Sequence, residues 1–524
     1  MSTVNPTSPS GDLFALLDED GDGEISSAEL EGMLAGRGIE MTDPRFAQVK
    51  SRLDAIRRTM TPAIDSTRFG DLFGSGLSLL RKAVQNQLVI PDFQQFRNDV
   101  EHIFDAQRSN DGGEVATYIP QLANVGPSLY GLSVTTVDGQ RMDMGDSDTA
   151  FCVQSSFKPL GYCLALEEHG PEGVHNHVGR EPSGRSFNEL ALNHEGKPHN
   201  PMINAGAVMS CALIQPQAAM ADRFDHLLSR WRKACGNESV GFSNSVYQSE
   251  RTTADRNFAL GYLMREQGAF PPDTDLMEVL DFYFQCCSIE VTTRSMSVAA
   301  ATLANGGVCP TTGEQVFSPD TVKSCLSLML SCGMYDFSGE FAFSFGIPAK
   351  SGVSGVIIGV VPNTLGFAVY SPRLDRIGNS VRGLNVCRGL MNTFNFHMFD
   401  SLAGRSAKRD PRRGRTQDRT AGVTQMIWAA SVGDLDSVRQ RASRGVDLGC
   451  ADYDLRTPLH LAAAEGHRHV VEFLLRGGVN SQCKDRWGHS PQDEAKRHGH
   501  HEIVELLSEQ SLGQFDKGEL SCVA

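Results

Sequence analysis

The stretch FCVQSSFKPLGYCLAL, residues 151–166, places Ser155 and Lys158 three positions apart, just before a run of apolar residues. Residues three apart on a helix lie on the same face, so the hydroxyl and the amine would be neighbours. A serine and an amine arranged in this way can act as a nucleophile and its base. The alternative interpretation is an exposed serine beside a solvated lysine.

A second stretch, PAKSGVSGVIIGVV at 348–361, favours the catalytic interpretation. It places Lys350 and Ser351 at the start of an apolar run that has the length of a buried strand. A Ser-x-x-Lys motif combined with Lys-Ser/Thr-Gly is typical of serine β-lactamases and penicillin-binding proteins. Lys158 must be neutral to accept a proton, and we expect burial and the second cation, Lys350, both to lower its pKa. Backbone N–H groups at Ser155 and near Val353 would hold the oxyanion.

Length and charge limit the classes of protein and of partner. A chain of 524 residues is too long for one ordinary core, which predicts two to four domains. The formal net charge of −15 argues against nucleic acid or an anionic membrane as the main partner. No apolar run approaches the roughly 20 residues that a membrane helix needs.

Cysteine usage and the N-terminal residues bear on the compartment. The 13 cysteines are odd in number and scattered, which favours reduced thiols inside a cell over a disulfide framework. No lysine or arginine precedes Arg37, so the start resembles neither a secretory signal nor a mitochondrial transit peptide. We therefore expect a cytoplasmic protein, with a mitochondrial location as the alternative.

Four regions differ in composition. Residues 11–100 are acidic and then helical in pattern, and residues 110–400 mix short apolar runs with many glycines, as a large α/β-type domain would. Residues 403–421 are basic, polar and without apolar periodicity, which predicts a linker. The basic cluster 408–415 within it is a solvated linker segment or, alternatively, a nuclear-import or anion-binding patch.

A repeat of about 33 residues follows the linker, over residues 424–512. Units begin at Thr424, Thr457 and Ser490, and each has a turn, a helix of small residues and an apolar helix. The signature Thr-Pro-Leu-His-x-Ala is complete at 457–462. This pattern predicts an ankyrin stack. Such a stack has no chemistry of its own, so it indicates a protein partner or packing against its own chain.

Residues 18–29, DEDGDGEISSAE, fit the calcium loop of an EF-hand. Gly23 stands where the loop turns sharply, Ser26 stands at position 9, and Ile25 would form the small strand that links paired hands. We therefore expect Ca²⁺ to bind, with the segment 53–73 as a partner hand that lacks the carboxylate series. The alternative is an acidic cap on the following helix. The proposed metal ligands are Asp18, Asp20, Asp22, the Glu24 carbonyl and Glu29.

Residues 117–400 closely resemble the serine-dependent glutaminases of the animal kidney and liver type. The layout of an EF-hand-like front, a catalytic domain and C-terminal ankyrin repeats is similar as well. The segments that carry the resemblance include YIPQLA (118–123), FCVQSSFKPL (151–160), VGREPSGRSFN (178–188), KPHNPMINAGA (197–207), SERTTADRNFA (249–259), LDFYFQCCSIEVT (280–292) and CGMYDFSG (332–339).

The resemblance implies a multidomain protein whose α/β catalytic domain has a β-lactamase-like (serine transpeptidase-like) fold and hydrolyses L-glutamine to L-glutamate and ammonia. Matched by motif, Ser155 would be the nucleophile, Lys158 its base, and Tyr335 would assist proton transfer to the leaving ammonia. Val353 and Ser155 would supply the oxyanion N–H groups. The residues implied in substrate binding are Tyr118, Ser155, Asn204, Glu250, Asn257, Tyr283, Tyr335 and Val353.

These residue types suit a zwitterionic amino acid. Glu250 can pair with the substrate ammonium, and Asn204 and Asn257 can donate to its carboxylate. Each also has a structural alternative: Tyr283 as a core aromatic, Asn204 as a helix cap, and Glu250 in a surface ion pair with Arg251.

The chain departs from the family at Glu189 and Ala191, where the activation loop normally carries a lysine and a second phenylalanine. This puts activation by phosphate in doubt. We still expect a homo-oligomer, a dimer or tetramer, because the family forms them. Two other functions compete with glutamine hydrolysis: a different amidase that shares the Ser-x-x-Lys motif, and a catalytically inactive, calcium-responsive ankyrin scaffold.

Overall fold

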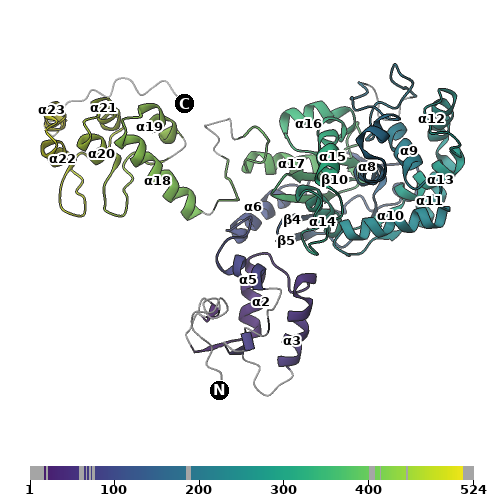
Figure 1. Cartoon of the computed structure of the whole chain (residues 1–524), viewed down its shortest axis with the longest axis horizontal. Helices are drawn as coiled ribbons and strands as arrows, with labels where there is room; N and C mark the ends of the chain where they lie inside the picture. Colours follow the sequence, from purple (N-terminus) through teal and green to yellow (C-terminus); the bar gives the residue numbers. More distant parts are fainter. Residues whose placement is uncertain are drawn as a thin grey trace. The chain divides into compact units, whose positions relative to one another are not determined.

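A computed structural model of the chain divides into two compact units. The first comprises Met1–Met398 with Asp410–Arg412, and the second comprises Phe399–Arg409 with Arg413–Ala524 (Figure 1). The structure describes all residues except 1–13, 15–16, 19–21, 58–63, 66–67, 70–71, 73–76, 185–189, 401–407, 414, 444–445 and 511–524. No helix among the described residues combines the length and the apolar character that crossing a membrane requires.

The N-terminal part of the first unit is a small helical domain with one pair of short strands. β1 (Glu24–Ile25) pairs antiparallel with β2 (Ile64–Asp65), so that Ile25 lies opposite Ile64. Both isoleucines are buried in a common core. The structure thus pairs the predicted calcium loop with the segment predicted as its partner hand. The helices of this domain are α2 (Ser27–Gly36), α3 (Ala47–Arg57) and α5 (Leu77–Val84), with a 3₁₀ turn, η1 (Pro44–Phe46).

A five-stranded antiparallel sheet forms the centre of the catalytic part, in the order β5-β4-β11-β10-β9. The side chains of β10 alternate between two cores. Val356, Ile358 and Val360 face one core, and Ile357 and Val361 face the other. Both faces of the sheet are therefore covered, which explains why the strands Val356–Val361 and Leu365–Tyr370 are nearly continuous apolar runs. The strands are β4 (Gly131–Thr136), β5 (Arg141–Gly145), β9 (Ala349–Gly352), β10 (Val356–Val361) and β11 (Leu365–Tyr370).

Helices cover the two faces of this sheet. α14 (Thr293–Ala304) packs on one face, and α6 (Phe93–Asp105) and α17 (Val381–Thr393) contribute to the core on the other. The domain boundary predicted at residue 100 is wrong, because it falls inside α6. Phe96, Val100 and Phe104 of that helix are buried in the same core as the sheet.

A large helical part packs beside α14. Capping residues mark the start of two of its helices. Asp275 accepts from the N–H groups of Met277 and Glu278 at the start of the helix 276–287, and Ser318 caps the helix 319–332, which has Pro319 at its first position. Together with the sheet, this part confirms the predicted β-lactamase-like fold. Its helices are α8 (Lys158–His175), α9 (Asn204–Leu213), α10 (Met220–Ala234), α11 (Asn244–Thr253), α12 (Asp255–Glu266), α13 (Leu276–Cys287) and α15 (Pro319–Cys332).

Short elements complete the first unit and hold several of the site residues. They are β3 (Glu114–Val115), α7 (Pro120–Ala123), β6 (Phe151–Cys152), η3 (Gln154–Phe157), β7 (Gly241–Phe242), β8 (Ile289–Val291), η4 (Tyr335–Phe337), α16 (Ser338–Ser344) and β12 (Arg373–Leu374). β6, β7 and β8 form a small sheet that leads directly into η3.

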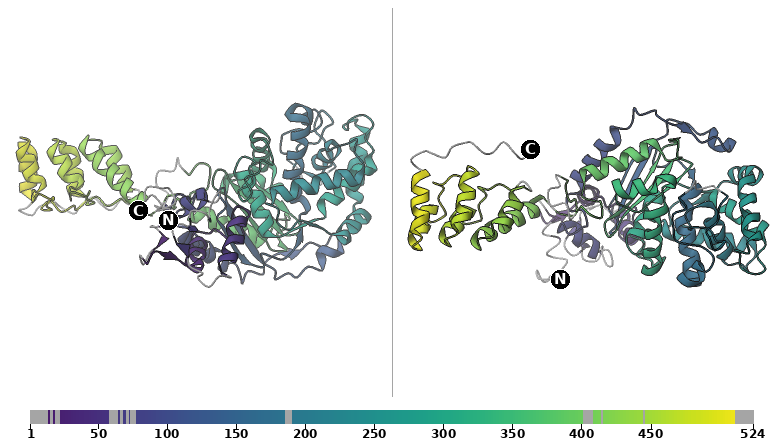
Figure 2. Two further views of the ribbon diagram at one scale, coloured as in Figure 1. Left: turned by 60° about the horizontal axis from the view of Figure 1, so that its bottom comes forward. Right: turned by 90° about the horizontal axis from the view of Figure 1, so that it is seen from above.

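The second unit is a stack of helices (Figure 2) in which consecutive helices pair with one another. The first helices of the second and third pairs begin with capping boxes at Thr457 and Ser490, followed by a proline. The stack confirms the predicted ankyrin repeats. Its helices are α18 (Arg415–Ser431), α19 (Leu435–Ser443), α20 (Pro458–Ala464), α21 (Arg468–Arg476), α22 (Pro491–Arg497) and α23 (His501–Gln510).

The predicted linker, 403–421, is partly helical, which corrects the sequence prediction. α18 begins at Arg415, inside that stretch. Met426 and Ala430 anchor the helix in the ankyrin core. Once a helix is nucleated, its extension over residues of good helix propensity costs little, even without an apolar face. In the preceding segment Lys408 lies 2.9 Å from Asp400, and Arg412 lies 2.7 Å from Asp410.

The closest approach of α14 to the sheet sets a testable constraint at Gly366. A Cβ atom there would lie 2.2 Å from the backbone nitrogen of Ala301. We predict that Gly366→Ala destabilises the catalytic unit by about 1–3 kcal/mol, because helix and strand must move apart. Thermal unfolding would measure this. Gly32→Ala in α2, where nothing lies within 4 Å, serves as the control, and equal melting temperatures for the two variants would contradict the prediction.

Candidate active site

Ser155 and Lys158 meet where η3 runs into α8. The Nζ atom of Lys158 lies 2.9 Å from Ser155 Oγ. The two residues are only 8% and 1% exposed. The pair is thus buried and in hydrogen-bond contact, unlike the exposed serine and solvated lysine of the alternative interpretation.

Burial sets the protonation state of this pair. Removal from water lowers the pKa of Lys158 to about 8, which leaves a substantial neutral fraction near physiological pH. Lys350 on β9 is fully buried too, and burial together with repulsion from Lys158 holds its pKa well below the usual range. Burial is the main cause of the lowered pKa of Lys158, and the two buried lysines repel each other when both are charged. The expectation that Lys350 helps to lower the pKa of Lys158 stays a prediction.

Two asparagines extend the contacts of Lys158. Its Nζ atom donates to Asn204 Oδ1 at 2.7 Å, and Asn204 Nδ2 donates to Asn257 Oδ1 at 3.2 Å. Asn204 begins α9 and Asn257 lies in the first turn of α12. The side chain of Asn204 makes no capping hydrogen bond; the cap of α9 is Ile203, which makes none either. Asn204 therefore contacts Lys158 directly, and Asn257 is linked to Lys158 through Asn204.

Glu250 is the buried carboxylate of the site. It is 4% exposed, and burial raises its pKa. Among the residues that the structure describes, no lysine or arginine forms an ion pair with it, and the adjacent Arg251 pairs with Asp281 at 2.9 Å. The surface ion pair considered for Glu250 and Arg251 is therefore absent. A buried carboxylate without a cation suits a ligand that brings its own ammonium group.

Tyr118 links Glu250 to the residue before the nucleophile. Its hydroxyl lies 2.5 Å from Glu250 Oε1 and 2.5 Å from the side-chain Oε1 of Gln154. A phenol has one proton, so it can donate to only one of them, and Gln154 can instead donate once its amide is turned over. Tyr283 of α13 is buried nearby, and the charge on Glu250 contributes to raising its pKa.

Tyr335 and Val353 complete the group around Ser155. Burial raises the pKa of Tyr335, and the nearby hydroxyl groups of Ser155 and Ser351 and the Val353 backbone oppose that effect. The Nζ atom of Lys350 lies 4.6 Å from the centre of the Tyr335 ring. The phenol thus lies beside the nucleophile and close to the backbone of Val353, the residue that directly follows β9.

A cavity of about 460 Å³ lies beside this group of residues. Tyr335 forms part of its wall, with Asn200, Ile203, Ser331 and Asp336. Ser155 and Lys158 do not line it. Tyr335 is therefore the residue of the predicted site that lines this cavity.

Comparisons with known proteins agree with this geometry. The glutaminase family model matches residues 113–399, an ankyrin-repeat model matches 426–517 and an EF-hand model matches 10–91. Two mitochondrial liver-isoform glutaminases, from Mus musculus and Rattus norvegicus, are each 46% identical over 467 residues, covering 89% of this chain and 78% of theirs. A putative glutaminase 3 from Caenorhabditis elegans is 45% identical over 471 residues, covering 88% and 81%.

A solved structure titled "Probable glutaminase ybaS" is 38% identical with a TM-score of 0.54, covering 56% of this chain and 94% of that one.

The chain belongs to the glutaminase family.

The predicted site residues between 118 and 353 lie in one part of the catalytic unit, where Ser155, Lys158, Glu250, Tyr283 and Tyr335 are buried and Tyr118 is about half exposed. Gln154, which belongs to the same group, was missed. It is buried and hydrogen-bonded to Tyr118, with a backbone φ of 47°. Few residues other than glycine adopt this left-handed region, so the strain is a sign of a functional position. The only signal in the sequence was its place directly before Ser155.

The activation loop of the family lies only partly within the described residues. Glu189 falls outside them. Ala191 lines a second cavity of about 340 Å³, together with Arg180, His194 and His199. The doubt about phosphate activation, which depended on Glu189, stays a prediction.

The predicted calcium loop has the geometry of a cation site where it is described. The N–H of Gly23 donates to Asp18 Oδ2 at 3.0 Å, with Gly23 at a φ of 82°, and the N–H of Glu24 donates to Asp22 Oδ1. Asp18 Oδ1 is buried and has no hydrogen-bond partner among the described residues. Glu29 caps α2 by accepting from the Ser26 N–H at 2.8 Å. An orphaned carboxylate oxygen fits a Ca²⁺ ligand; Asp20 lies outside the described residues.

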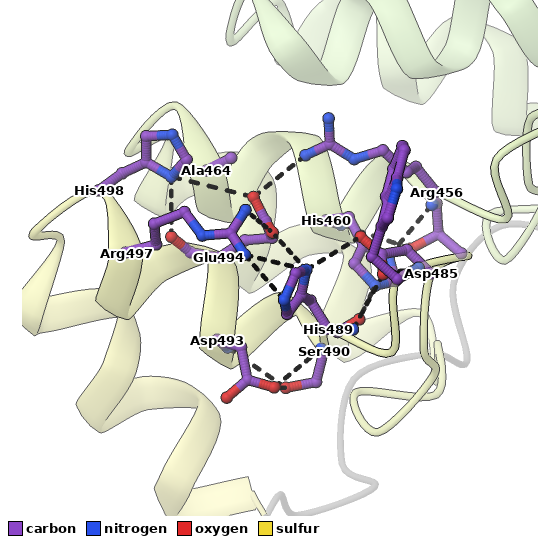
Figure 3. Close-up of polar contacts among 12 residues, drawn as sticks. Arg456, His460, Ala464, Asp485, His489, Ser490, Asp493, Glu494, Arg497 and His498 are labelled. Atoms are coloured by element: carbon purple, nitrogen blue, oxygen red, sulfur yellow. Dashed lines mark hydrogen bonds and ion pairs between the residues drawn. The ribbon is translucent and has the colours of Figure 1, made fainter.

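A second group of metal-ligating side chains lies in the ankyrin unit (Figure 3). Ligand atoms of Asp485, His489 and Glu494 lie within 4.8 Å of one another. Glu494, however, is 3.3 Å from Arg456 and 3.1 Å from Arg497. Two guanidinium groups already neutralise this buried carboxylate, so the cluster is an ion-pair network between successive repeats.

A base role for Lys158, as the sequence predicts, would make the pKa of this amine set the pH dependence of the glutaminase reaction. Because only the neutral amine accepts the serine proton, we predict that kcat/KM for L-glutamine rises with pH, with a midpoint near pH 8. Initial rates between about pH 6.5 and pH 9 would measure this profile.

Lys158→Arg is the control, because a guanidinium does not lose its proton in this range, and the variant should be inactive throughout. A wild-type profile that is flat or falls across the same range would contradict Lys158 as the base.

Proposed function

We propose that the chain hydrolyses L-glutamine through a γ-glutamyl ester on Ser155, with Lys158 as the base. The overall reaction, which yields L-glutamate and ammonia, follows from membership of the glutaminase family. The observation that supports the residue roles is the buried contact of 2.9 Å between Lys158 Nζ and Ser155 Oγ. A nucleophile within hydrogen-bond reach of a neutral amine is ready for attack on a carbonyl carbon.

In the first step, Ser155 Oγ attacks the side-chain amide carbon of glutamine while its proton moves to Lys158. The carbonyl oxygen gains negative charge and accepts from the backbone N–H groups of Ser155 and Val353. The carbon–nitrogen bond then breaks, and the nitrogen leaves as ammonia with a proton passed from Lys158 through Tyr335. The placement of the Tyr335 phenol beside Ser155 and at the cavity wall supports this role.

In the second step, a water molecule attacks the ester carbon. Its proton passes to Lys158 and then to Ser155 Oγ as the ester bond breaks, which restores the enzyme and releases L-glutamate. The same base thus serves both halves of the reaction, and no cofactor is needed for either.

Recognition of the substrate rests on its two charged ends. Glu250 would pair with the α-ammonium, and the raised pKa that burial gives this carboxylate would return toward its usual value once the cation is bound. Asn204, Asn257 and the phenols of Tyr118 and Tyr283 would hold the α-carboxylate. A buried site that pairs both ends rejects ligands that lack either one, because a polar group would be left unpaired.

Substitution of the nucleophile tests the proposal. We predict that Ser155→Ala lowers ammonia and glutamate release from L-glutamine about a thousandfold or more. Ser156→Ala is a matched control, because the neighbouring hydroxyl donates to the Val153 carbonyl inside the fold and should leave most activity. Equal activity of the wild type and Ser155→Ala would refute the assignment. A wild-type protein without activity would instead favour the alternative of a catalytically inactive, calcium-responsive ankyrin scaffold.

We also propose that Ca²⁺ binds the loop 18–29, supported by the match to an EF-hand model and by the orphaned oxygen of Asp18. Glu29 would leave its cap on Ser26 to supply two carboxylate oxygens to the ion.

Isothermal titration with CaCl₂ tests this site. We predict one ion per chain and at least about tenfold weaker binding for Glu29→Gln, which loses one charged ligand. Glu31→Gln, two residues further along α2, removes the same charge outside the loop and should bind as the wild type does. No uptake at millimolar calcium would rule the site out.

The protein partner, the oligomeric state and the location are proposed in more general terms. The ankyrin match supports a protein partner for the second unit. A homo-oligomer, dimer or tetramer, is proposed on the family resemblance alone. The two murine relatives are named as mitochondrial, and the cytoplasmic location of this chain stays a prediction.

A further inference from the structure

The backbone of Tyr335 is strained. Its φ of 56° lies in the left-handed region, which bulky residues seldom adopt. Such a conformation persists only where the surroundings hold it, and it is found where a side chain must be aimed. The residue whose phenol reaches the nucleophile therefore depends on neighbours that fix its position.

One of these neighbours is a tight turn at residues 375–379, which connects β12 to α17. The carboxylate oxygen Oδ1 of Asp375 accepts from three consecutive backbone N–H groups, those of Ile377, Gly378 and Asn379, at 2.8, 2.9 and 3.0 Å. The N–H of Asp375 donates to the Asn379 carbonyl at 2.8 Å. One carboxylate thus fixes the shape of the whole turn.

The turn contacts both sides of the reacting centre. Gly378 has a φ of 98°, and a Cβ atom built on it would lie 3.7 Å from the Tyr335 ring and 3.8 Å from the side chain of Val353. Asn379 is fully buried, and its Nδ2 atom lies 3.5 Å from the carbonyl of Met334, the residue before Tyr335. The turn therefore packs against the residue proposed to transfer the proton and against the one proposed to hold the oxyanion.

We propose that Asp375 is a positioning residue for the reaction: by locking the 375–379 turn, it holds Tyr335 in place for proton transfer to the leaving ammonia. Asp375 touches neither the substrate nor Ser155, and it acts through Gly378 and Asn379. The inference rests on the proposed role of Tyr335. Removing the carboxylate would free three N–H groups and loosen the turn, and misplacing a catalytic group by a fraction of an ångström is costly.

The test compares two substrates that differ in what their leaving group needs. Ammonia must receive a proton to leave L-glutamine, whereas the p-nitrophenolate of L-glutamic acid γ-(p-nitrophenyl ester) leaves as an anion. The parameter kcat/KM covers the steps up to formation of the γ-glutamyl ester for both. A defect in proton transfer therefore lowers kcat/KM for glutamine much more than for the ester, whereas general damage to the site lowers both alike.

We predict that Asp375→Ala, made in the full chain, lowers kcat/KM for glutamine about tenfold to a hundredfold, with a change of about threefold or less for the ester. Asp375→Asn keeps an oxygen acceptor at the same place and should restore most of the glutamine activity. Asp452→Ala is the matched control. Asp452 Oδ1 fixes an equivalent five-residue turn in the ankyrin unit by accepting from the backbone N–H groups of Asp454 and Arg456. Its loss should leave kcat/KM unchanged for both substrates.

Tyr335→Phe tests the proton-transfer role of Tyr335 separately from the positioning role of Asp375. Suppose that Tyr335→Phe lowers kcat/KM more for glutamine than for the p-nitrophenyl ester, whereas Asp375→Ala lowers both equally or neither. That result would overturn the inference about the turn and leave the role of Tyr335 intact. Equal losses in Tyr335→Phe would instead overturn the role of Tyr335. If Asp375→Ala does not fold, Gly378→Ala serves instead, because it strains the same turn without crowding the Tyr335 ring. The comparison of kcat/KM for glutamine and for the p-nitrophenyl ester then tests the role of the turn in the same way.

Discussion

The contact between Lys158 and Ser155 depends on taking an amine out of water. In water the lysine would be a cation and could accept no proton, so the site must bury it, and the helices α8, α9 and α13 do so. Burial lowers the pKa of Lys158 to about 8. The same burial raises the pKa of Glu250 and of Tyr335. Burial thus shifts the pKa values of an amine, a carboxylate without a cationic partner and a phenol in the same part of the catalytic unit.

That condition also explains the architecture around the site. The sheet is covered on both faces, so β9 can present Lys350 and Ser351 to the interior without water. Asn204 accepts a hydrogen bond from Lys158 in place of solvent, and Asn257, from a different helix, in turn accepts one from Asn204. Buried polar groups of this kind hold a fixed geometry because each lost hydrogen bond would be costly.

Sequence reasoning located features whose signals are local. Ser155 and Lys158 are three residues apart, the loop that indicates the EF-hand is twelve residues long, and the ankyrin capping signals lie within one turn. Contacts between distant segments were inaccessible to spacing alone. Asn204 is 46 positions from Lys158, and only the family resemblance placed it in the site. Gln154 and the Asp375 turn had no distinctive motif, because their importance comes from left-handed backbone that only the folded chain reveals. The start of α18 was missed because a basic, polar helix has no apolar period.

The most direct measurement of the central claim is identification of the covalent intermediate. The full-length enzyme would be mixed with L-glutamine labelled with ¹³C, quenched in acid within milliseconds and digested for mass spectrometry. The account predicts a γ-glutamyl label on the peptide that contains Ser155, attached to that residue. A label attached to any other residue would contradict it.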